Sequence, residues 1–347
     1  MTYPPVAVVG GGMWGTTLAV RLARRVPVTL LVRTAESARA LARSRENPRL
    51  PGVRLPDAVS ITANPAALEG AREVVIVALP CAALRSVVAV LADRIKPDAV
   101  IVSAAKGLEK QTLRRMTEVL AEEIPAKAGR LAALSGPNLA LEIARGLPAA
   151  AVVAAPDDTV STAVAGLLEG PDFRLYRSRD VVGVELAGAL KNVIAIAAGA
   201  AEQLGLGDNA KAALVTRGLA EMTRLGIAAG AHPLTFAGLA GLGDIVATCW
   251  SPLSRNHRLG AELAGGRRWT EIEASLPGVA EGAYTVVAAL GLAARLGVEL
   301  PIARQVHAAI YEGKPVAACI AELMGRSSKD ELESLGHAAG VTGALPA

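Results

Sequence analysis

Lys191 lies in an apolar helical pattern whose neighbouring positions carry very small side chains. Ala187, Gly188, Ala195 and Ala198 are spaced so that they share its helix face. A ligand can therefore approach the ammonium closely, and desolvation there would favour the neutral amine. We expect Lys191 to move protons to and from an alcohol oxygen. The alternative is a lysine that extends outward from an alanine-rich packing face.

Asp244 ends a segment that is dense in glycine, with the sequence GLAGLGD over residues 238–244. This density suggests a loop whose backbone is approached closely by another group. The carboxylate has three open interpretations. It pairs with Lys191, it binds a substrate hydroxyl, or it caps the helix that follows.

Two further sets of polar residues are typical of anion binding. Ser254, Arg255 and Asn256 stand where a helix is expected to start, and a hydroxyl, a guanidinium, an amide and a helix N-terminus suit a phosphate monoester. The alternative there is a capping serine beside a solvated arginine. Lys106 follows an expected strand, so it is either a cation facing a cofactor cleft or an ordinary solvated lysine.

A glycine turn between a strand and a helix occupies the beginning of the chain. The apolar run Val6–Val9 leads into Gly10, Gly12 and Gly15, which have the G-x-G-x-x-G spacing of a dinucleotide-binding turn. In such a turn the first glycine makes the bend, the second admits a pyrophosphate, and the third lets helix and strand pack closely. The sequence therefore predicts a nicotinamide or related dinucleotide as cofactor.

Arg33 follows the next apolar run, residues 26–32, where an NAD-preferring unit would carry an acidic residue. A guanidinium cannot accept a hydrogen bond from a ribose hydroxyl, but it can pair with a 2′-phosphate. An arginine at this position therefore favours NADP(H) as the cofactor. NAD(H) is the alternative.

Strand and helix patterns alternate through the first half of the chain. The strand runs are too apolar for a half-exposed sheet, which favours an α/β fold with a doubly wound, mostly parallel, Rossmann-type sheet. The expected strands are 6–9, 26–32, 73–79, 99–103, 131–134, 149–154 and 173–176, with helices at 37–45, 84–91, 111–123 and 159–168.

Strand patterns stop near residue 180. We expect a Rossmann-type cofactor domain over residues 1–180 and an all-α substrate and catalytic domain over 181–347, with a ligand cleft at their junction. The expected helices are 181–204, 211–229, 254–264, 284–296, 301–312 and 316–324, and the chain is expected to fray after Leu335.

Composition narrows the class of protein. The net charge of +4 suits an anionic ligand, and no basic block of the kind that binds nucleic acid is present. Cys81, Cys249 and Cys319 are far apart and lack metal-ligand spacing, so we expect buried thiols in a reducing compartment and no metal. The apolar stretch 181–204 carries charged residues at its centre, which argues against a membrane span and favours a cytoplasmic protein.

Taken in order, the motifs resemble those of the NAD(P)-dependent glycerol-3-phosphate dehydrogenases, over about residues 5–330. The resemblance implies reversible reduction of dihydroxyacetone phosphate to sn-glycerol 3-phosphate, a precursor of glycerophospholipids. It also implies a homodimer. The segments that carry it are Gly10–Thr16, Ala105–Gly107, Ser135–Pro137, Glu185–Val193, Gly241–Asp244, Ser254–Asn256 and Glu281–Gly282.

The same resemblance assigns roles to individual residues. It implies that Lys191 and Asp244 are the catalytic residues and that Lys191 is the acid/base. It implies substrate contacts at Lys106, Gly136, Asn138, Lys191, Asp244, Ser254, Arg255 and Asn256. It implies cofactor contacts at Gly10, Gly12, Met13, Trp14, Gly15, Arg33, Lys106, Ala140, Arg255, Val279 and Glu281. Asn138 departs from the family pattern, where we expect serine, so an amide would replace a hydroxyl there.

Two other functions stay open. A related two-domain dehydrogenase of the β-hydroxy-acid or ketopantoate type would share the sheet and a lysine on the first helix after it. It would lack the 241–244 segment and the phosphate site at 254–256. A nucleotide-sensing module without catalysis would keep the glycine turn and lose Lys191 and Asp244.

Overall fold

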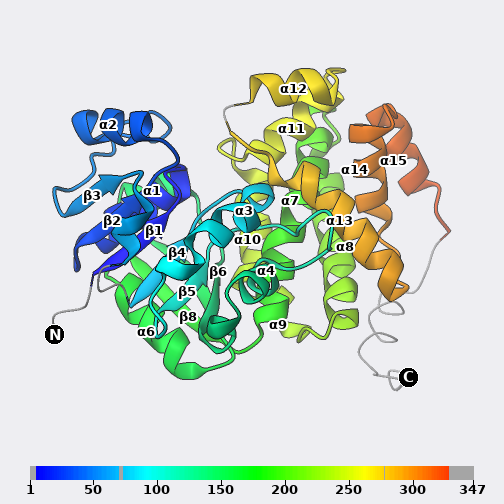
Figure 1. Cartoon of the computed structure of the whole chain (residues 1–347). Coiled ribbons are helices and arrows are strands. Elements are labelled where there is room, and N and C mark those ends of the chain that lie inside the picture. The colour runs from blue at the N-terminus through cyan, green and yellow to red at the C-terminus, as the bar shows by residue number, and fades with distance from the viewer. Residues whose placement is uncertain (1–4, 70–72, 277, 328–347) are drawn as a thin grey trace. The chain divides into compact units, whose positions relative to one another are not determined.

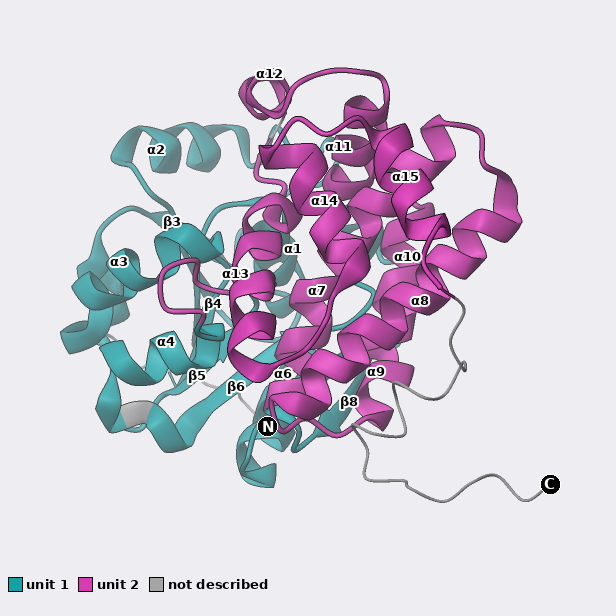
Figure 2. Cartoon of the chain, turned by 90° about the vertical axis from the view of Figure 1, so that its right-hand side faces the viewer, with its two compact units in different colours: residues 1–106, 114–181 teal, residues 107–113, 182–347 magenta. Residues whose placement is uncertain are grey.

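The computed structural model describes residues 5–69, 73–276 and 278–327. The chain divides into two compact units, shown in separate colours in Figure 2. The first unit comprises Met1–Lys106 and Arg114–Val181, and the second comprises Gly107–Leu113 and Val182–Ala347. The short segment Gly107–Leu113 thus belongs to the second unit, although it lies within the part of the sequence expected to form the first. The fraying expected after Leu335 lies outside the described residues.

The first unit is built on an eight-stranded sheet with the order β3-β2-β1-β4-β5-β6-β7-β8 (Figure 1). Every neighbouring pair is parallel except β6 and β7, which are antiparallel. This confirms the mostly parallel Rossmann-type sheet predicted from the sequence. The strands are β1 (Val6–Val9), β2 (Val28–Leu31), β3 (Val59–Thr62), β4 (Val74–Val77), β5 (Val100–Ser103), β6 (Leu131–Ser135), β7 (Ala149–Ala154) and β8 (Phe173–Ser178).

Helices cover both faces of this sheet, and alternate residues of each strand pack against opposite layers. In β1, Val6 and Val8 face one core, whereas Ala7 and Val9 face the other. The first core includes α1 (Met13–Leu22), α2 (Ala35–Ser44), α5 (Ala140–Ala144) and α6 (Asp158–Leu168), and the second includes α3 (Cys81–Leu91) and α4 (Met116–Glu123). The strand order reverses beside β1, so the carboxyl ends of β1 and β4 form the place where such sheets bind ligands.

The structure corrects several details of the predicted first unit, and it adds the short helix α5, which was not predicted. Strand β3 was not predicted, because its four residues, VSIT, are half polar. Helix α4 begins at Met116 rather than near residue 111, since Leu113 has a left-handed φ of 63° that a helix excludes. Three short 3₁₀ helices were also not predicted, at Pro65–Leu68, Ala92–Arg94 and Pro125–Arg130.

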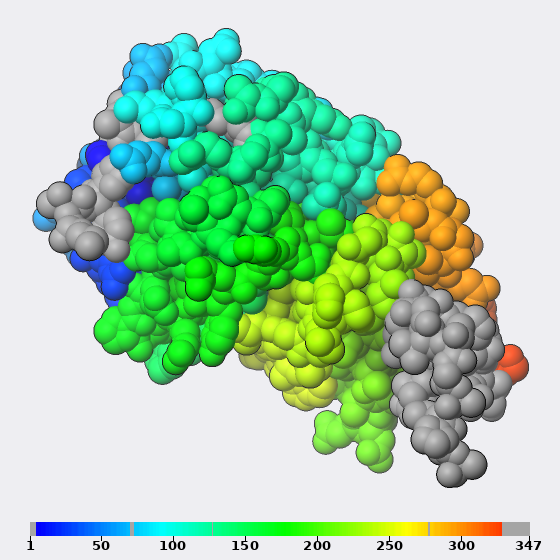
Figure 3. All heavy atoms as spheres, turned by 90° about the horizontal axis from the view of Figure 1, so that it is seen from below, coloured from blue at the N-terminus to red at the C-terminus, as the bar shows by residue number. Residues whose placement is uncertain are grey.

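All the named elements of the second unit are helices, joined by loops, within its described residues (Figure 1). Helices α9, α10 and α12 lie outside the helix ranges predicted from the sequence, because each spans two turns or fewer. Figure 3 shows the yellow-green region of α8 and α9 at the surface of this unit. Its helices are α7 (Val181–Gln203), α8 (Gly207–Ala228), α9 (Leu234–Ala237), α10 (Asp244–Trp250), α11 (Arg255–Ala264), α12 (Trp269–Ser275), α13 (Glu281–Leu296), α14 (Pro301–Tyr311) and α15 (Val316–Met324).

Helix α7 is the core helix of the second unit. By length and hydropathy it is the one described helix that passes the test for a membrane span, yet 83% of its most apolar window is buried within the structure. Its backbone lies directly against α11. A Cβ on Gly199 would lie 1.9 Å from the carbonyl oxygen of His257, and one on Gly260 would lie 1.8 Å from that of Ile196. Burial of this kind is typical of a packed core helix.

A buried carboxyl group joins α8 to the N-terminus of α14. The Glu221 side chain accepts hydrogen bonds from the backbone N–H groups of Ile302, at 2.7 Å, and Ala303, at 3.4 Å. These are N–H groups that the helix itself leaves without partners. Burial raises the pKa of Glu221 to about 7, because the ionised form loses its hydration and the two hydrogen bonds compensate only in part.

We expect Gly15→Ala to destabilise the first unit. A Cβ at Gly15 would lie 1.9 Å from the carbonyl oxygen of Gly10, so the turn must shift, which typically costs about 1–3 kcal/mol. The measurement is the free energy of unfolding in urea. Gly12→Ala is the matched control, because a Cβ there meets nothing within 4 Å. Equal loss of stability in both variants would contradict this account of the turn.

We expect Glu221→Gln to reduce the pH dependence of stability. Because the folded-state pKa is raised, the group destabilises the fold progressively as pH rises from about 4.5 to about 7. A shift of this size corresponds to about 3 kcal/mol. Glutamine keeps one acceptor for α14 and does not ionise, so its free energy of unfolding should vary less between pH 5 and 8. An unchanged pH profile would show that Glu221 titrates normally.

Candidate functional site

Lys191 is held by two polar partners in the interior of the second unit. The residue is only 7% exposed. Its Nζ donates hydrogen bonds to Oδ1 of Asp244 at 3.0 Å and to Oγ1 of Thr248 at 2.7 Å. A buried ammonium requires such partners, and these two use two of its three N–H groups. The outward-extending lysine considered from the sequence is therefore not what the structure shows.

Asp244 lies in the position expected of a charge partner for Lys191. It is the first residue of α10 and not its N-cap, which is Gly243, so the capping alternative is wrong. The residue is 2% exposed. Its buried carboxylate is paired with the neighbouring ammonium, as a buried charge requires.

The glycine-dense segment before Asp244 is a π-helix, Leu239–Gly243, rather than the expected loop. A Cβ on Gly241 would lie 2.1 Å from the carbonyl oxygen of Phe236, at the end of α9. The close approach predicted for these glycines is therefore to the chain's own backbone. Single π-turns are rare and are frequently found at functional sites.

Thr248 is a site residue that the sequence analysis did not identify. It lies one turn after Asp244 on α10, accepts from Lys191, and donates to Oδ1 of Asp244 at 3.1 Å. The i,i+4 spacing of the two residues was a usable signal, because such residues share a helix face. The adjacent Cys249 is buried, and burial raises the pKa of its thiol to about 12, which keeps the thiol protonated.

The predicted phosphate site is the start of α11. The Ser254 hydroxyl accepts from the backbone N–H of His257 at 3.1 Å, so this serine is the N-cap, as one alternative proposed. The Asn256 amide bridges α7 and α13, since it donates to Oδ1 of Asn192 at 2.8 Å and accepts from the Gly282 N–H at 3.0 Å. Asn256 therefore fixes the position of this turn with its oxygen and keeps a second N–H for a ligand.

Arg255 lies exposed at the same helix start. A Cβ on Gly278 would lie 2.7 Å from its guanidinium Nη1, and Gly278 has a left-handed φ of 103°. Glycine is thus required where this segment passes the arginine. Val279 and Glu281, two of the expected cofactor contacts, follow directly, both are part-buried, and Glu281 is the first residue of α13.

The glycine turn of the first unit has the geometry that a pyrophosphate requires. Gly10 has a left-handed φ of 117°, and a Cβ there would lie 2.4 Å from the carbonyl oxygen of Ala78, at the end of β4. The space beside Gly12 is open. The Asn47 amide supports the turn by donating to the Gly11 carbonyl at 3.1 Å and to the Thr16 hydroxyl at 2.7 Å. Asn47 is buried, and the sequence analysis did not identify it as a residue that supports this turn.

Met13 and Trp14 begin α1 directly after this turn. The indole Nε1 of Trp14 is buried without a hydrogen-bond partner among the described residues. Arg33, at the end of β2, is exposed, and no ion pair joins it to any part of the chain that the structure describes. An open glycine, an indole N–H without a partner and an exposed cation are groups that fit a bound dinucleotide phosphate.

A second group of predicted contacts follows β5 and β6. Lys106 donates to the carbonyl oxygen of Gly136 at 2.7 Å, and Gly136 has a left-handed φ of 122°. Both amide atoms of Asn138 are buried without a partner in the described residues, and so are the hydroxyls of Ser103 and Ser135. Buried polar atoms cost free energy unless they are paired, so this edge of the sheet fits a polar ligand.

Ala140 begins α5 beside this edge, and its carbonyl accepts from the Thr17 hydroxyl of α1 at 3.0 Å. The predicted residues thus form one group at the carboxyl edge of the sheet in the first unit and one around Lys191 and α11 in the second. That the two groups line a single cleft stays a prediction.

Comparison with known proteins identifies relatives of both units. Residues 5–161 match the family described as NAD-dependent glycerol-3-phosphate dehydrogenase N-terminus, and residues 180–321 match the corresponding C-terminus. A glycerol-3-phosphate dehydrogenase [NAD(P)+] of Streptomyces griseus is 49% identical over 335 residues, which cover 95% of this chain and 99% of that protein. One of Moorella thermoacetica is 46% identical, with 95% and 98% covered.

Solved structures agree with these matches. The crystal structure of a glycerol-3-phosphate dehydrogenase from Coxiella burnetii has a TM-score of 0.89 and 34% identity, and covers 94% of this chain and 100% of that one. A ketopantoate reductase from Ralstonia eutropha shares the fold alone, with a TM-score of 0.57 and 16% identity, and covers 92% of this chain and 99% of that one. The chain therefore belongs to the family of NAD(P)-dependent glycerol-3-phosphate dehydrogenases.

Proposed function

We propose that this protein reversibly reduces dihydroxyacetone phosphate to sn-glycerol 3-phosphate with NADPH, and that Lys191 is the general acid/base. The observation that carries the proposal is the buried contact of Lys191 with Asp244 and Thr248 in a chain of this family. A structural ion pair would explain the Lys191–Asp244 contact alone. It would not explain the buried polar atoms of Trp14, Ser135 and Asn138 in the first unit, which have no partner among the described residues.

Lys191 supplies the proton in the proposed reduction. The nicotinamide, when bound, supplies a hydride for C2 of the substrate. Lys191 donates a proton from Nζ to the C2 oxygen, which becomes the alcohol, and is left as a neutral amine. In the oxidation direction the same amine takes the proton back. A positioned acid of this kind contributes about 10²–10⁴-fold to the rate.

Asp244 and Thr248 hold the lysine in place for this transfer. The carboxylate stabilises the ammonium before the proton leaves, and it orients the amine afterwards. The Thr248 hydroxyl accepts from Nζ and donates to Asp244, so it restricts the amine to one direction. We propose these as positioning roles.

Substrate binding is proposed at the start of α11 and at the edge of the first unit. Arg255, the remaining N–H of Asn256 and the N-terminus of α11 suit the phosphate group. Lys106 and Asn138 are proposed to contact the substrate from the first unit. The Asn138 amide offers both a donor and an acceptor where the family pattern has a hydroxyl.

Cofactor binding is proposed at the glycine turn, with Met13, Trp14, Ala140, Val279 and Glu281 as further contacts. We propose that Arg33 makes the enzyme prefer NADPH over NADH, because its exposed guanidinium can pair with a 2′-phosphate. The homodimer and the cytoplasmic location implied by the sequence stay predictions.

Lys191→Ala is expected to lower kcat by at least about 10²-fold, because the variant lacks the proposed proton donor. Oxidation of NADPH by dihydroxyacetone phosphate, followed by absorbance, measures it. The Kd for NADPH, measured by fluorescence, should stay near the wild-type value. Turnover at the wild-type rate would remove Lys191 from the mechanism.

Arg33→Gln is expected to lower the ratio of kcat/KM for NADPH to kcat/KM for NADH by about 10-fold or more, since a hydrogen bond between charged groups is worth about 1.5–3 kcal/mol. Arg43→Gln, on the exposed surface of α2, is the matched control and should leave the ratio unchanged. A wild-type enzyme that prefers NADH would refute the 2′-phosphate assignment.

A further inference from the structure

A second buried lysine in the helical unit has no part in the mechanism above. Lys211, on α8, is 5% exposed, and its ammonium forms an ion pair with Oε2 of Glu202, on α7. The same ammonium lies 4.8 Å above the centre of the Trp250 ring. The Glu202 oxygen that binds Lys211 also lies 3.3 Å from Nε2 of His257. One ion pair therefore contacts two aromatic residues from two further helices.

These two aromatic residues stand at the two ends of one short connection. Trp250 is the last residue of α10, and His257 is the third residue of α11. The six residues between them, 251–256, include the whole proposed phosphate site. The Lys211–Glu202 pair therefore holds both ends of the segment that presents Ser254, Arg255 and Asn256.

The backbone packing of α7 on α11 explains how Glu202 reaches His257. Gly199 lets the His257 carbonyl approach α7 to near contact, and Glu202 lies three residues later on the same face of α7. The hydrogen bond from Lys211 is the main cause that lowers the pKa of Glu202, with the charge of His257 as a further cause. The carboxylate is thus ionised near neutral pH and available to both partners.

We propose that Lys211 and Glu202 are positioning residues that hold the 251–256 connection in the shape that binds the substrate phosphate. This inference rests on the proposed phosphate site at the start of α11. Neither residue is placed at the substrate or the reacting atoms. Their effect should therefore fall on substrate affinity, while the proton transfer at Lys191 proceeds as before.

The test compares Glu202→Gln and Lys211→Met with the wild-type enzyme. We expect KM for dihydroxyacetone phosphate to rise about 10-fold in both, as for the loss of one charge-assisted contact. We expect kcat to stay within about 3-fold and the Kd for NADPH to stay unchanged, and kcat/KM for unphosphorylated dihydroxyacetone should also be unchanged. A general loss of folded enzyme would not raise KM for dihydroxyacetone phosphate while leaving kcat and the Kd for NADPH near their wild-type values.

Two variants are needed because their effects on folding differ. Glu202→Gln leaves the Lys211 ammonium buried without its carboxylate, which is strongly destabilising. Lys211→Met removes the buried charge and leaves Glu202 half exposed, with its side chain 54% accessible to water. If the first variant does not fold, the second still gives the kinetic result.

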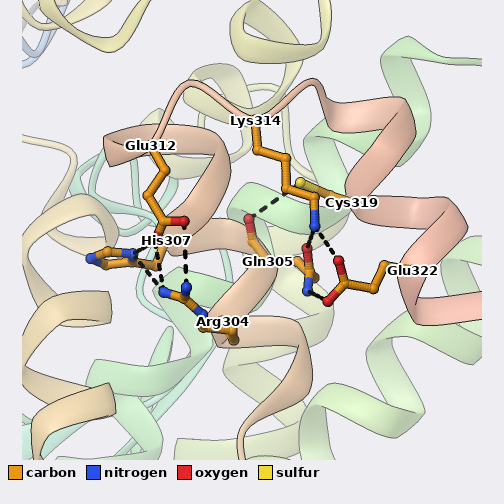
Figure 4. Close-up of polar contacts among 7 residues, drawn as sticks. All are labelled: Arg304, Gln305, His307, Glu312, Lys314, Cys319 and Glu322. Atoms are coloured by element: carbon orange, nitrogen blue, oxygen red, sulfur yellow. Dashed lines mark hydrogen bonds and ion pairs between the residues drawn. The ribbon is translucent and has the colours of Figure 1, made fainter.

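Glu322→Gln is the matched control. Figure 4 shows Lys314 between Glu322 and Gln305, where its Nζ donates to Oε1 of Gln305 at 2.8 Å and pairs with Oε2 of Glu322. Glu322 is 59% accessible, similar to the 54% of Glu202. The pair joins the loop after α14 to α15, and no hydrogen bond or ion pair among the described residues links it to the 251–256 connection. We expect wild-type KM in this variant.

Three outcomes would overturn the inference. Wild-type KM in Lys211→Met would show that the ion pair does not position the connection. The same rise in KM in Glu322→Gln would show a general loss of stability. If wild-type kcat/KM is similar for dihydroxyacetone and its phosphate, the proposed phosphate site is wrong, and the positioning role is wrong with it.

Discussion

The burial of the Lys191 ammonium is the constraint on which the second unit depends. An ammonium removed from water costs several kcal/mol unless a carboxylate and further acceptors replace its hydration. Asp244 and Thr248 provide that replacement from α10, more than fifty residues along the chain. Helix α10 must therefore begin beside α7, and the π-turn packed on Phe236 leads the chain to that point. A small displacement of α10 would leave a buried charge without its partner.

Helix α7 also organises the residues around this pair. Asn192, next to Lys191, accepts from Asn256, which in turn accepts from the first turn of α13. Two turns later Gly199 admits the backbone of α11, and Glu202 reaches His257 and Lys211. The proposed proton donor and the proposed phosphate site are thus attached to one rigid element. Catalytic groups held on a rigid helix keep the geometry that proton transfer requires.

The first unit is built on a different principle, in which backbone shape matters more than charge. Gly10, Gly15 and Gly136 stand where a side chain would collide with neighbouring atoms or strain the backbone. Around them, Trp14, Ser135 and Asn138 hold buried polar atoms for which the described residues supply no partner. Such atoms are costly in a folded protein unless a ligand satisfies them. This edge of the sheet is therefore shaped for a polar ligand.

The sequence by itself determined the sheet, the glycine turn, the helical second unit and the family, because apolar periodicity and glycine spacing are local properties. It also predicted a desolvated Lys191 from its small neighbours, with an outward-extending lysine as the alternative. Only the tertiary structure decided which interpretation of Asp244 holds, that β7 runs antiparallel to β6, and that Thr248 and Asn47 support the two sites. It likewise decided that Asn256 bridges α7 and α13. These contacts join residues far apart in sequence, and their geometry depends on how whole helices pack, which no local pattern encodes.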